Sequence, residues 1–248
     1  MADACLRVCA LYPDLMNIYA DRGNLRLLQQ RCRWRGIEFE LITCGVGDRL
    51  DPEGADLYYM GGGQDRDQVL CAGDLYATKR EQLAAAAARG AVIFGVCGGY
   101  QLLGHSYELG DQHLPGAGLV DLITVRSDGP RLIGNVAIEV ELEPGRPRIL
   151  AGFENHGGRT ALGPDELALG RVLKGHGNDG RTGAEGVRRG NVIGTYLHGP
   201  LLPKNVWFAD WLIATATGLP TPLAALDDTL EDAAHAEARH AAGVWTRH

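Results

Sequence analysis

AVIFGVCGGYQLLG, residues 91–104, is an apolar run that leads into a cysteine flanked by glycines. An unbroken apolar run is typical of a strand buried on both faces, and helix-compatible residues follow it. The pattern Gly95-x-Cys97-x-Gly99 predicts a tight strand-to-helix turn, because a Cβ at either glycine would crowd it. At a helix N-terminus, free N–H groups and the helix dipole favour a thiolate. We therefore predict that Cys97 is a nucleophile; the alternative is a buried structural cysteine.

Upstream of this segment, strand patterns alternate with helix patterns. Glycines end the two helices, at Gly36 and Gly90. We predict strands at 6–12, 37–44, 55–60 and 91–96, and helices at 25–35 and 79–89. This order is typical of an α/β fold with a doubly wound, mostly parallel sheet and flanking helices. Sites in such sheets form at the carboxyl ends of the strands, where Gly61-Gly62-Gly63 and Cys97 both lie.

Downstream of the cysteine, the pattern changes to short alternating strands. Residues 132–142 alternate apolar and polar side chains, which predicts an antiparallel extension of the fold. Further strands are expected at 149–154, 167–173 and 191–198, a glycine-rich loop or hairpin at 175–190, and helices at 203–216 and 223–242. No repeat or linker interrupts the chain, so we expect one domain over residues 1–248.

Composition excludes several classes of protein. The chain has 248 residues, 45% of them hydrophobic, and a formal net charge of −7, which gives no footprint for nucleic acid. It has neither a membrane-spanning apolar run nor a basic-then-apolar leader, so we expect it in the cytoplasm. The six cysteines lack the paired spacing of a zinc site, and we expect free thiols and no metal.

A cysteine nucleophile needs a base and an oxyanion site. Among the eight histidines, His198 is preferred because it ends a predicted buried strand, with His156 as the second choice. Backbone amides in glycine-rich turns stabilise an oxyanion, and Gly98 and the loop with Gly62 and Gly63 provide them. That loop lacks the Gly-Lys-Ser/Thr ending of a phosphate-binding loop, and we expect no cofactor and no ATP site in this chain.

Two segments resemble a known family. Residues 95–101, Gly-Val-Cys-Gly-Gly-Tyr-Gln, resemble the nucleophile segment of class I glutamine amidotransferases. Residues 194–200, Gly-Thr-Tyr-Leu-His-Gly-Pro, resemble the histidine segment of their cobyric acid synthase-like branch. Within this branch, the segments 19–24, 61–65 and 198–205 are most similar to the glutaminase subunits of lipid II isoglutaminyl synthases.

The resemblance implies an activity, a partner and site residues. It implies a glutaminase that passes ammonia to a MurT-like, ATP-dependent subunit of the Mur-ligase family, which amidates the D-glutamate of the lipid II stem peptide. It also implies that Cys97 is the nucleophile, His198 the base, Gln101 a contact to bound glutamine, and Arg131 a substrate-binding residue. A guanidinium matches an α-carboxylate, although Arg131 is equally consistent with an ordinary surface residue at a strand end.

One position departs from the wider class, and other functions remain open. Many class I members have a glutamate two residues after the histidine, but this chain has Pro200 there. Either a dyad suffices, or another acid such as Glu154 or Asp210 approaches in space. The alternative functions are the amidotransferase part of a cobyrinic or cobyric acid synthase, a catalytically silent partner-binding module, and a cysteine hydrolase or peptidase.

Overall fold

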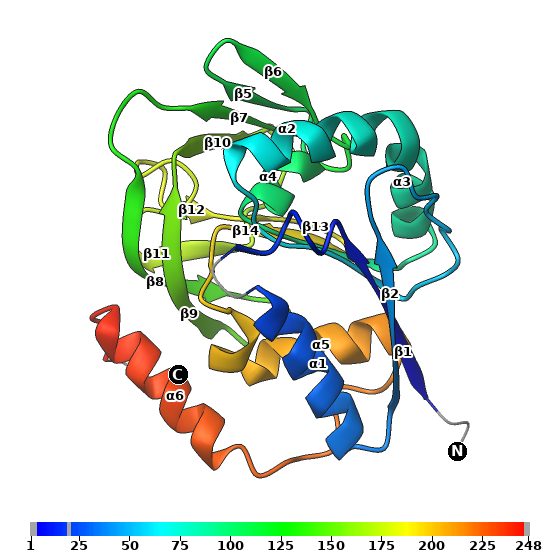
Figure 1. Ribbon diagram of the computed structural model, residues 1–248. Helices are drawn as coiled ribbons and strands as arrows, with labels where there is room; N and C mark the ends of the chain where they lie inside the picture. Colours follow the sequence, from blue (N-terminus) through cyan, green and yellow to red (C-terminus); the bar gives the residue numbers. More distant parts are fainter. Residues whose placement is uncertain (1–3, 19–20, 246–248) are drawn as a thin grey trace.

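The computed structural model describes residues 4–18 and 21–245, and its centre is a six-stranded sheet (Figure 1). Tyr19 and Ala20, which open one of the segments quoted above, lie outside the described residues. The strand order is β13-β14-β4-β3-β1-β2, parallel except for β13. The strands are β1 (Cys5–Leu11), β2 (Glu38–Cys44), β3 (Leu57–Met60), β4 (Val92–Val96), β13 (Val187–Arg189) and β14 (Val192–Thr195).

Helices cover both faces of this sheet, as a doubly wound fold requires (Figure 1). On one face lie α1 (Arg22–Trp34) and α5 (Val206–Thr217). On the other lie α2 (Asp65–Asp74), the π-helical turn η2 (Leu75–Lys79), α3 (Arg80–Ala88) and α4 (Gly98–Leu103). The predicted α/β class is therefore confirmed.

Two helical details differ from the predictions. Helix α2 was not predicted from the sequence, because its acidic first turn and its internal Gly73 hide the apolar spacing. The helix expected from Pro203 is divided into a 3₁₀ turn, η3 (Leu202–Lys204), and α5. The division falls at Asn205, whose side chain bonds the backbone N–H and C=O of Ala151 instead of continuing a helix.

Two four-stranded sheets extend from the main sheet. The predicted extension has the order β12-β11-β8-β9 and is antiparallel: β8 (Leu132–Val140), β9 (Arg148–His156), β11 (Gly170–Lys174) and β12 (Ala184–Glu185). The second sheet was not predicted, because its strands are only four or five residues long. Its order is β10-β7-β5-β6: β5 (Ser106–Leu109), β6 (Gln112–Pro115), β7 (Leu122–Arg126) and β10 (Gly158–Leu162).

The C-terminal helix α6 (Thr229–Ala241) packs against β8, β9 and η3. Figure 1 shows it crossing the outside of the fold as a separate arm. His235 bonds the carbonyl oxygen of Lys204 at 2.8 Å, and Asn135 donates to the carbonyl oxygen of Ala241 at 3.0 Å. Across the described ranges, none of the helices is both long enough and apolar enough to cross a membrane.

Candidate active site

Three neighbouring strands end at one edge of the main sheet. Met60 at the end of β3 pairs with Gly95 of β4, and Thr195 at the end of β14 pairs with Val96. The residues after these strand ends are therefore neighbours: the glycine loop, Cys97, and the segment that reaches His198. This is the edge at which sites form in doubly wound sheets.

Cys97 occupies a strained turn between β4 and α4. Its φ is 50° and its ψ is −103°, and its amide donates to the carbonyl oxygen of Thr195 at 2.8 Å. A positive φ is unfavourable for a residue with a Cβ, and such strain is concentrated at functional sites. The cysteine is 6% exposed, so its sulfur is enclosed by protein rather than open to bulk water.

The flanking glycines allow the backbones around this turn to approach closely. A Cβ on Gly95 would lie 2.8 Å from the carbonyl carbon of Gly99, and one on Gly99 would overlap the carbonyl oxygen of Met60. The amide of Gly99 donates to the carbonyl oxygen of Gly61 at 3.0 Å. The first turn of α4 is thus held directly against the end of β3.

The glycine loop and the turn at Cys97 face each other. The amide nitrogen of Gly63 lies 3.0 Å from the position of a Cβ on Gly98. A Cβ on Gly62 would be 3.0 Å from Cε1 of His198, so the loop also touches the imidazole. The amide of Gly62 donates to Asp21, which leaves the amides of Gly63 and Gly98 as the candidates for an oxyanion site.

His198 lies between Cys97 and a carboxylate. Its side chain is buried and interacts with Cys97, and its Nδ1 lies 3.5 Å from Oδ1 of Asp21. Burial lowers the pKa of His198, but the charge of Cys97 and the hydrogen bonds with Asp21 and Cys97 raise it to about 10. The arrangement therefore favours the protonated form of His198 beside the carboxylate of Asp21.

The backbone leaves β14 before it reaches His198, so the prediction of a strand ending on the histidine was wrong. Side-chain oxygens take the amides there: Tyr196 donates to Glu185 at 2.7 Å and Leu197 to Oγ1 of Thr195 at 3.1 Å. His198 then pairs with Phe153 of β9 through two backbone hydrogen bonds of 2.8 and 3.2 Å. Contact with β9 of the predicted antiparallel extension thus sets the position of the imidazole.

Asp21, the acid beside His198, was not predicted from the sequence. Asp21 immediately precedes α1 in the loop after β1, and it is fully buried. Its Oδ2 accepts the amide of Gly62 at 2.8 Å, which directs Oδ1 toward the imidazole. One feature of the sequence could have indicated this role. Asp21 follows β1, and β1 is the direct neighbour of β3, the strand that leads into the glycine loop.

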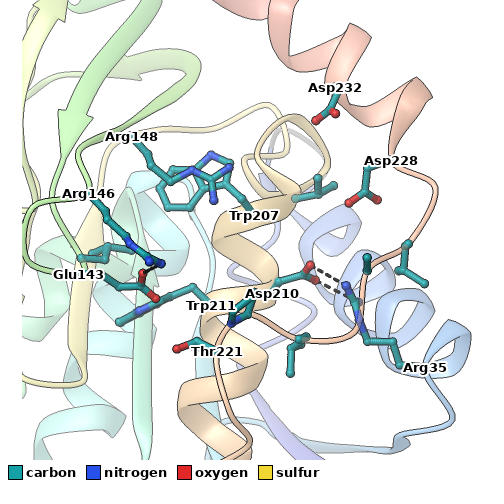
Figure 2. A pocket seen from close by; sticks show the side chains of 16 residues that line it. Arg35, Glu143, Arg146, Arg148, Trp207, Asp210, Trp211, Thr221, Asp228 and Asp232 are labelled. Carbon is teal, nitrogen blue, oxygen red and sulfur yellow. Dashed lines mark hydrogen bonds and ion pairs between the residues drawn. The ribbon is translucent and has the colours of Figure 1, made fainter. Parts of the chain in front are cut away.

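The two acids considered from the sequence lie elsewhere. Glu154 accepts the backbone amides of His176 and Gly177 at 2.7 and 3.0 Å. Asp210 bonds Arg35 at 2.7 Å and lines a cavity of about 450 Å³ between α5 and the chain before α6 (Figure 2). The residues that line this cavity include neither Cys97 nor His198.

His156, the second choice for the base, belongs to a different buried contact. Its ring stacks on Tyr196 with centroids 3.6 Å apart, and its Nδ1 bonds the carbonyl oxygen of Gly158 at 2.9 Å. Burial lowers the pKa of His156, which favours its neutral form. The imidazole of His156 therefore packs against the ring of Tyr196 and stabilises its position.

Gln101 and Arg131 lie at different depths. Gln101 is buried; its amide oxygen accepts from Gln68 at 3.0 Å and its amide nitrogen donates to Tyr196 at 3.2 Å. Arg131 is exposed and donates to the side-chain and main-chain oxygens of Asn155 at 2.7 and 2.8 Å. Gln101 is thus part of a buried hydrogen-bond network with Gln68 and Tyr196, and Arg131 lies at the surface.

Within the described ranges, no group of three or more histidine, cysteine, aspartate or glutamate side chains could hold a metal ion. The described cysteines are all free thiols.

Comparisons with known proteins show which chains are similar to this one. Two curated proteins named "Lipid II isoglutaminyl synthase (glutamine-hydrolyzing) subunit GatD" are similar to the chain. The one from Streptococcus pneumoniae is 36% identical over 85% of this chain and 80% of its own length. The one from Staphylococcus aureus is 36% identical over 88% of each chain.

A solved structure has the same fold. The solved structure of PurLQS from Thermotoga maritima matches with a TM-score of 0.53 and 23% identity, over 86% of this chain and 95% of the other. The model of the CobB/CobQ-like glutamine amidotransferase domain matches residues 7–206. The resemblance noted from the sequence is therefore confirmed, and the chain belongs to the CobB/CobQ-like glutamine amidotransferase family.

Proposed function

We propose that this chain is the glutaminase subunit of a two-subunit ligase, and that Cys97, His198 and Asp21 form its catalytic centre. The contact of a strained cysteine with a buried imidazole, itself beside a carboxylate, is the observation that carries the catalytic part. Such a constellation supports nucleophilic attack on an amide.

The reaction has two steps. The thiolate of Cys97 attacks the side-chain amide carbon of glutamine, and the amides of Gly63 and Gly98 stabilise the oxyanion. The imidazolium of His198 gives its proton to the amide nitrogen, ammonia leaves, and a thioester remains. His198 then takes a proton from water as the water attacks the thioester, and glutamate leaves as the thiol re-forms. Asp21 keeps the imidazole oriented throughout.

The names of the relatives support a lipid II acceptor and a partner subunit. Two proteins that match most of this chain are named as glutamine-hydrolysing subunits of a lipid II isoglutaminyl synthase. We infer that ammonia passes to a MurT-like, ATP-dependent subunit of the Mur-ligase family, which amidates the D-glutamate of the lipid II stem peptide. The free thiols are consistent with a cytoplasmic location, where cysteines stay reduced.

Reconstitution tests this proposal. The chain is mixed with a MurT-like subunit, ATP, lipid II and glutamine labelled at its amide nitrogen, and the lipid is analysed by mass spectrometry. We expect the label in the stem peptide with wild type and no label with Cys97→Ala at equal protein concentration. Label in a cobyrinic acid acceptor instead would overturn the acceptor, and glutamate release by Cys97→Ala would overturn the nucleophile.

A further inference from the structure

A buried ion pair lies at the junction of α2 and η2, apart from the catalytic centre proposed above. Nζ of Lys79, the last residue of η2, pairs with Oδ2 of Asp74, the last residue of α2. Their side chains are 0% and 8% exposed, so both charges are held away from water. A buried ion pair adds little net stability compared with an apolar pair, because both charges lose their hydration. Stability alone therefore does not explain this pair.

The carboxylate of Asp74 connects the loops that follow β1 and β2, at the carboxyl edge of the main sheet. Its Oδ2 accepts the hydroxyl of Tyr12 at 2.7 Å, and its Oδ1 accepts the amide of Gly47 at 2.9 Å. Tyr12 directly follows β1, and Gly47 lies in the loop after β2. Nζ of Lys79 lies over the Tyr12 ring, 5.3 Å from its centroid, within the range of a cation–π contact. The ion pair thus holds the tyrosine by its hydroxyl and by its ring.

Tyr12 and the helical turn beside it both have unusual backbone geometry. The φ of Tyr12 is 51°, and among the described residues that have a Cβ only Cys97 also has a positive φ. The turn η2 is π-helical, and it buries Leu75 and Lys79. Both kinds of irregularity are unfavourable in themselves and are concentrated at functional sites. Here the two meet at one buried carboxylate.

The loop that begins at Tyr12 packs against the glycine loop. The carbonyl oxygen of Tyr12 accepts the amides of Leu15 and Met16 at 3.0 and 2.8 Å. Sδ of Met16 occupies the position that a Cβ on Gly63 would take, and its carbonyl oxygen lies 2.5 Å from the position of a Cβ on Gly61. Met16 is buried, so it has little freedom to move away. The contacts therefore run from Tyr12 to the glycine whose amide is a candidate for the oxyanion site.

A hydrogen bond from the same loop fixes one peptide plane of the glycine loop. The amide of Ile18 donates to the carbonyl oxygen of Gly62 at 3.1 Å. The carbonyl of Gly62 and the amide of Gly63 belong to the same planar trans peptide, in which they point in opposite directions. The bond from Ile18 therefore directs the N–H of Gly63 away from the loop. Asp21 accepts the amide of Gly62 at 2.8 Å and holds the other side of this glycine.

We propose that Tyr12, Asp74 and Lys79 are positioning residues for the oxyanion site. They fix the start of the loop after β1, and this loop sets the direction in which the amide of Gly63 points. Preorganised donors stabilise a developing oxyanion because they need not reorient during the reaction. The inference rests on the proposed attack of Cys97 on glutamine, since that attack forms the oxyanion.

Tyr12→Phe tests this role, because it removes the hydroxyl that Asp74 accepts and keeps the ring beside Lys79. Glutamate release by the full chain is measured over a range of glutamine concentrations, with and without a MurT-like subunit. A misplaced donor weakens binding of the transition state more than binding of glutamine. We therefore expect kcat to fall about tenfold to a hundredfold and KM to stay unchanged.

Alkylation by iodoacetamide shows whether the nucleophile itself is affected. The sulfur of Cys97 bonds the methylene carbon of the reagent as iodide leaves, and no oxyanion forms. The rate of labelling, measured by intact-protein mass spectrometry, should therefore be the same for Tyr12→Phe and wild type.

Tyr58→Phe is the matched control. Tyr58 of β3 is another buried tyrosine of the main sheet, and its hydroxyl donates at 2.5 Å to the carbonyl oxygen of Asp51, in the loop before β3. Each variant loses the hydroxyl bond of one buried tyrosine, so both melting temperatures should fall by similar amounts. The control should keep the wild-type kcat, because its bond lies at the opposite edge of the sheet.

Met16→Ala tests the route through the loop. It removes the side chain that packs against Gly63, so kcat should again fall with KM unchanged. Because both changes act on the same peptide plane, the double variant with Tyr12→Phe should lose no more kcat than the more affected single variant.

Two kinds of result would contradict these expectations. A wild-type kcat for Tyr12→Phe, an equal loss of kcat in Tyr58→Phe, or losses that multiply in the double variant would overturn the positioning role alone. A wild-type chain that releases no glutamate, with or without the MurT-like subunit, would overturn the proposed function and the positioning role with it.

Discussion

At the residue scale, the position of one carboxylate determines the state of the imidazole. Asp21 bonds the amide of Gly62 through one oxygen and faces Nδ1 of His198 with the other. An acid in this position fixes the tautomer and orientation of a histidine and stabilises its protonated form. Pro200 occupies the position where the wider class has its glutamate, and Asp21 reaches the same imidazole from the other end of the sequence.

We expect Asp21→Asn to lower the turnover of glutamine by about a hundredfold or more, because the imidazole loses the carboxylate that orients it. The asparagine oxygen can still accept the amide of Gly62, so the loop keeps its shape. The pKa of His198 should fall from about 10, since a hydrogen bond and a charge that raise it are removed. Glutamate release as a function of pH measures both effects.

Asp14→Asn is the matched control for this change. Asp14 lies in the same loop after β1 and pairs with Arg22 at the surface, at 3.0 Å. This variant should keep the wild-type rate. Equal rates for Asp21→Asn and wild type would show that Cys97 and His198 suffice as a dyad.

At the scale of single elements, contact between backbones fixes the turn that carries Cys97. The first turn of α4 touches the end of β3, and Gly99 has no space for a Cβ beside the carbonyl of Met60. Gly73 in α2 is the opposite case, because a Cβ there would meet nothing within 4 Å. Packing therefore requires a glycine at position 99 but not at position 73.

Gly99→Ala should lower the free energy of unfolding by about 3 kcal/mol or more, because the backbone must shift to admit the methyl group. Gly73→Ala should raise it by up to about 1 kcal/mol, since alanine is the better residue inside a helix. Urea unfolding of both variants checks the pair. Similar changes in the free energy of unfolding for the two variants would contradict the close contact between β3 and α4.

A buried carboxylate holds the end of β14. Glu185 of β12 is fully buried and accepts the amide of Tyr196 and the hydroxyl of Thr195, at 2.7 and 3.0 Å. Burial, reinforced by Glu154, raises the pKa of Glu185 to about 8 against the lowering effects of these hydrogen bonds and of His198. Between pH 4.5 and 8 the folded chain therefore holds a proton that the unfolded chain has lost.

Because Glu185 keeps this proton in the folded chain, the free energy of unfolding should depend on pH. The contribution of Glu185 is fully present below pH 4.5 and is lost as the pH rises to about 8, at up to about 1.4 kcal/mol per pH unit. Glu185→Gln should remove this slope, because glutamine cannot ionise. Denaturant unfolding over this pH range measures the slope, with Glu139→Gln on the surface as the control. An equal slope in wild type and Glu185→Gln would refute the assignment.

At the scale of the whole molecule, a buried arginine ties the C-terminal segment to the fold. Arg31 of α1 is fully buried and bonds Asp210 of α5 and Asp228, which immediately precedes α6, at 2.5 and 2.6 Å. None of the residues of α6 is itself buried, so the ion pair between Arg31 and Asp228 adds to the surface contacts that hold this helix. The match to the family model ends at residue 206, so Asp228 and α6 lie beyond it.

Asp228→Asn should therefore loosen α6 and lower the free energy of unfolding by about 1–2 kcal/mol, less than for a fully buried pair because Asp228 is 24% exposed. Amide hydrogen exchange should become faster in 229–241 and stay unchanged in β4. Asp111→Asn, at an exposed position in the turn between β5 and β6, should leave both regions unchanged. Unchanged exchange in α6 for Asp228→Asn would mean that other contacts hold the helix.

The sequence by itself determined the parallel sheet and the turn at Cys97, because these features depend on local patterns. It also led to His198, although the strand that was expected to end on this residue stops at Thr195. Apolar runs predict buried strands, and glycines on both sides of a cysteine predict a strained turn. The short strands of the second extension and the acidic start of α2 carry weak local patterns, and they were missed.

Only the tertiary structure decided which groups surround the nucleophile. Asp21 and His198 are 177 positions apart and meet because β14, β4 and β3 are neighbours in the sheet, with β1 beside β3. Phe153 of β9 then holds the backbone of His198 where no strand pattern extends. Contacts between residues so distant in the chain arise from packing, which periodicity along the sequence does not record.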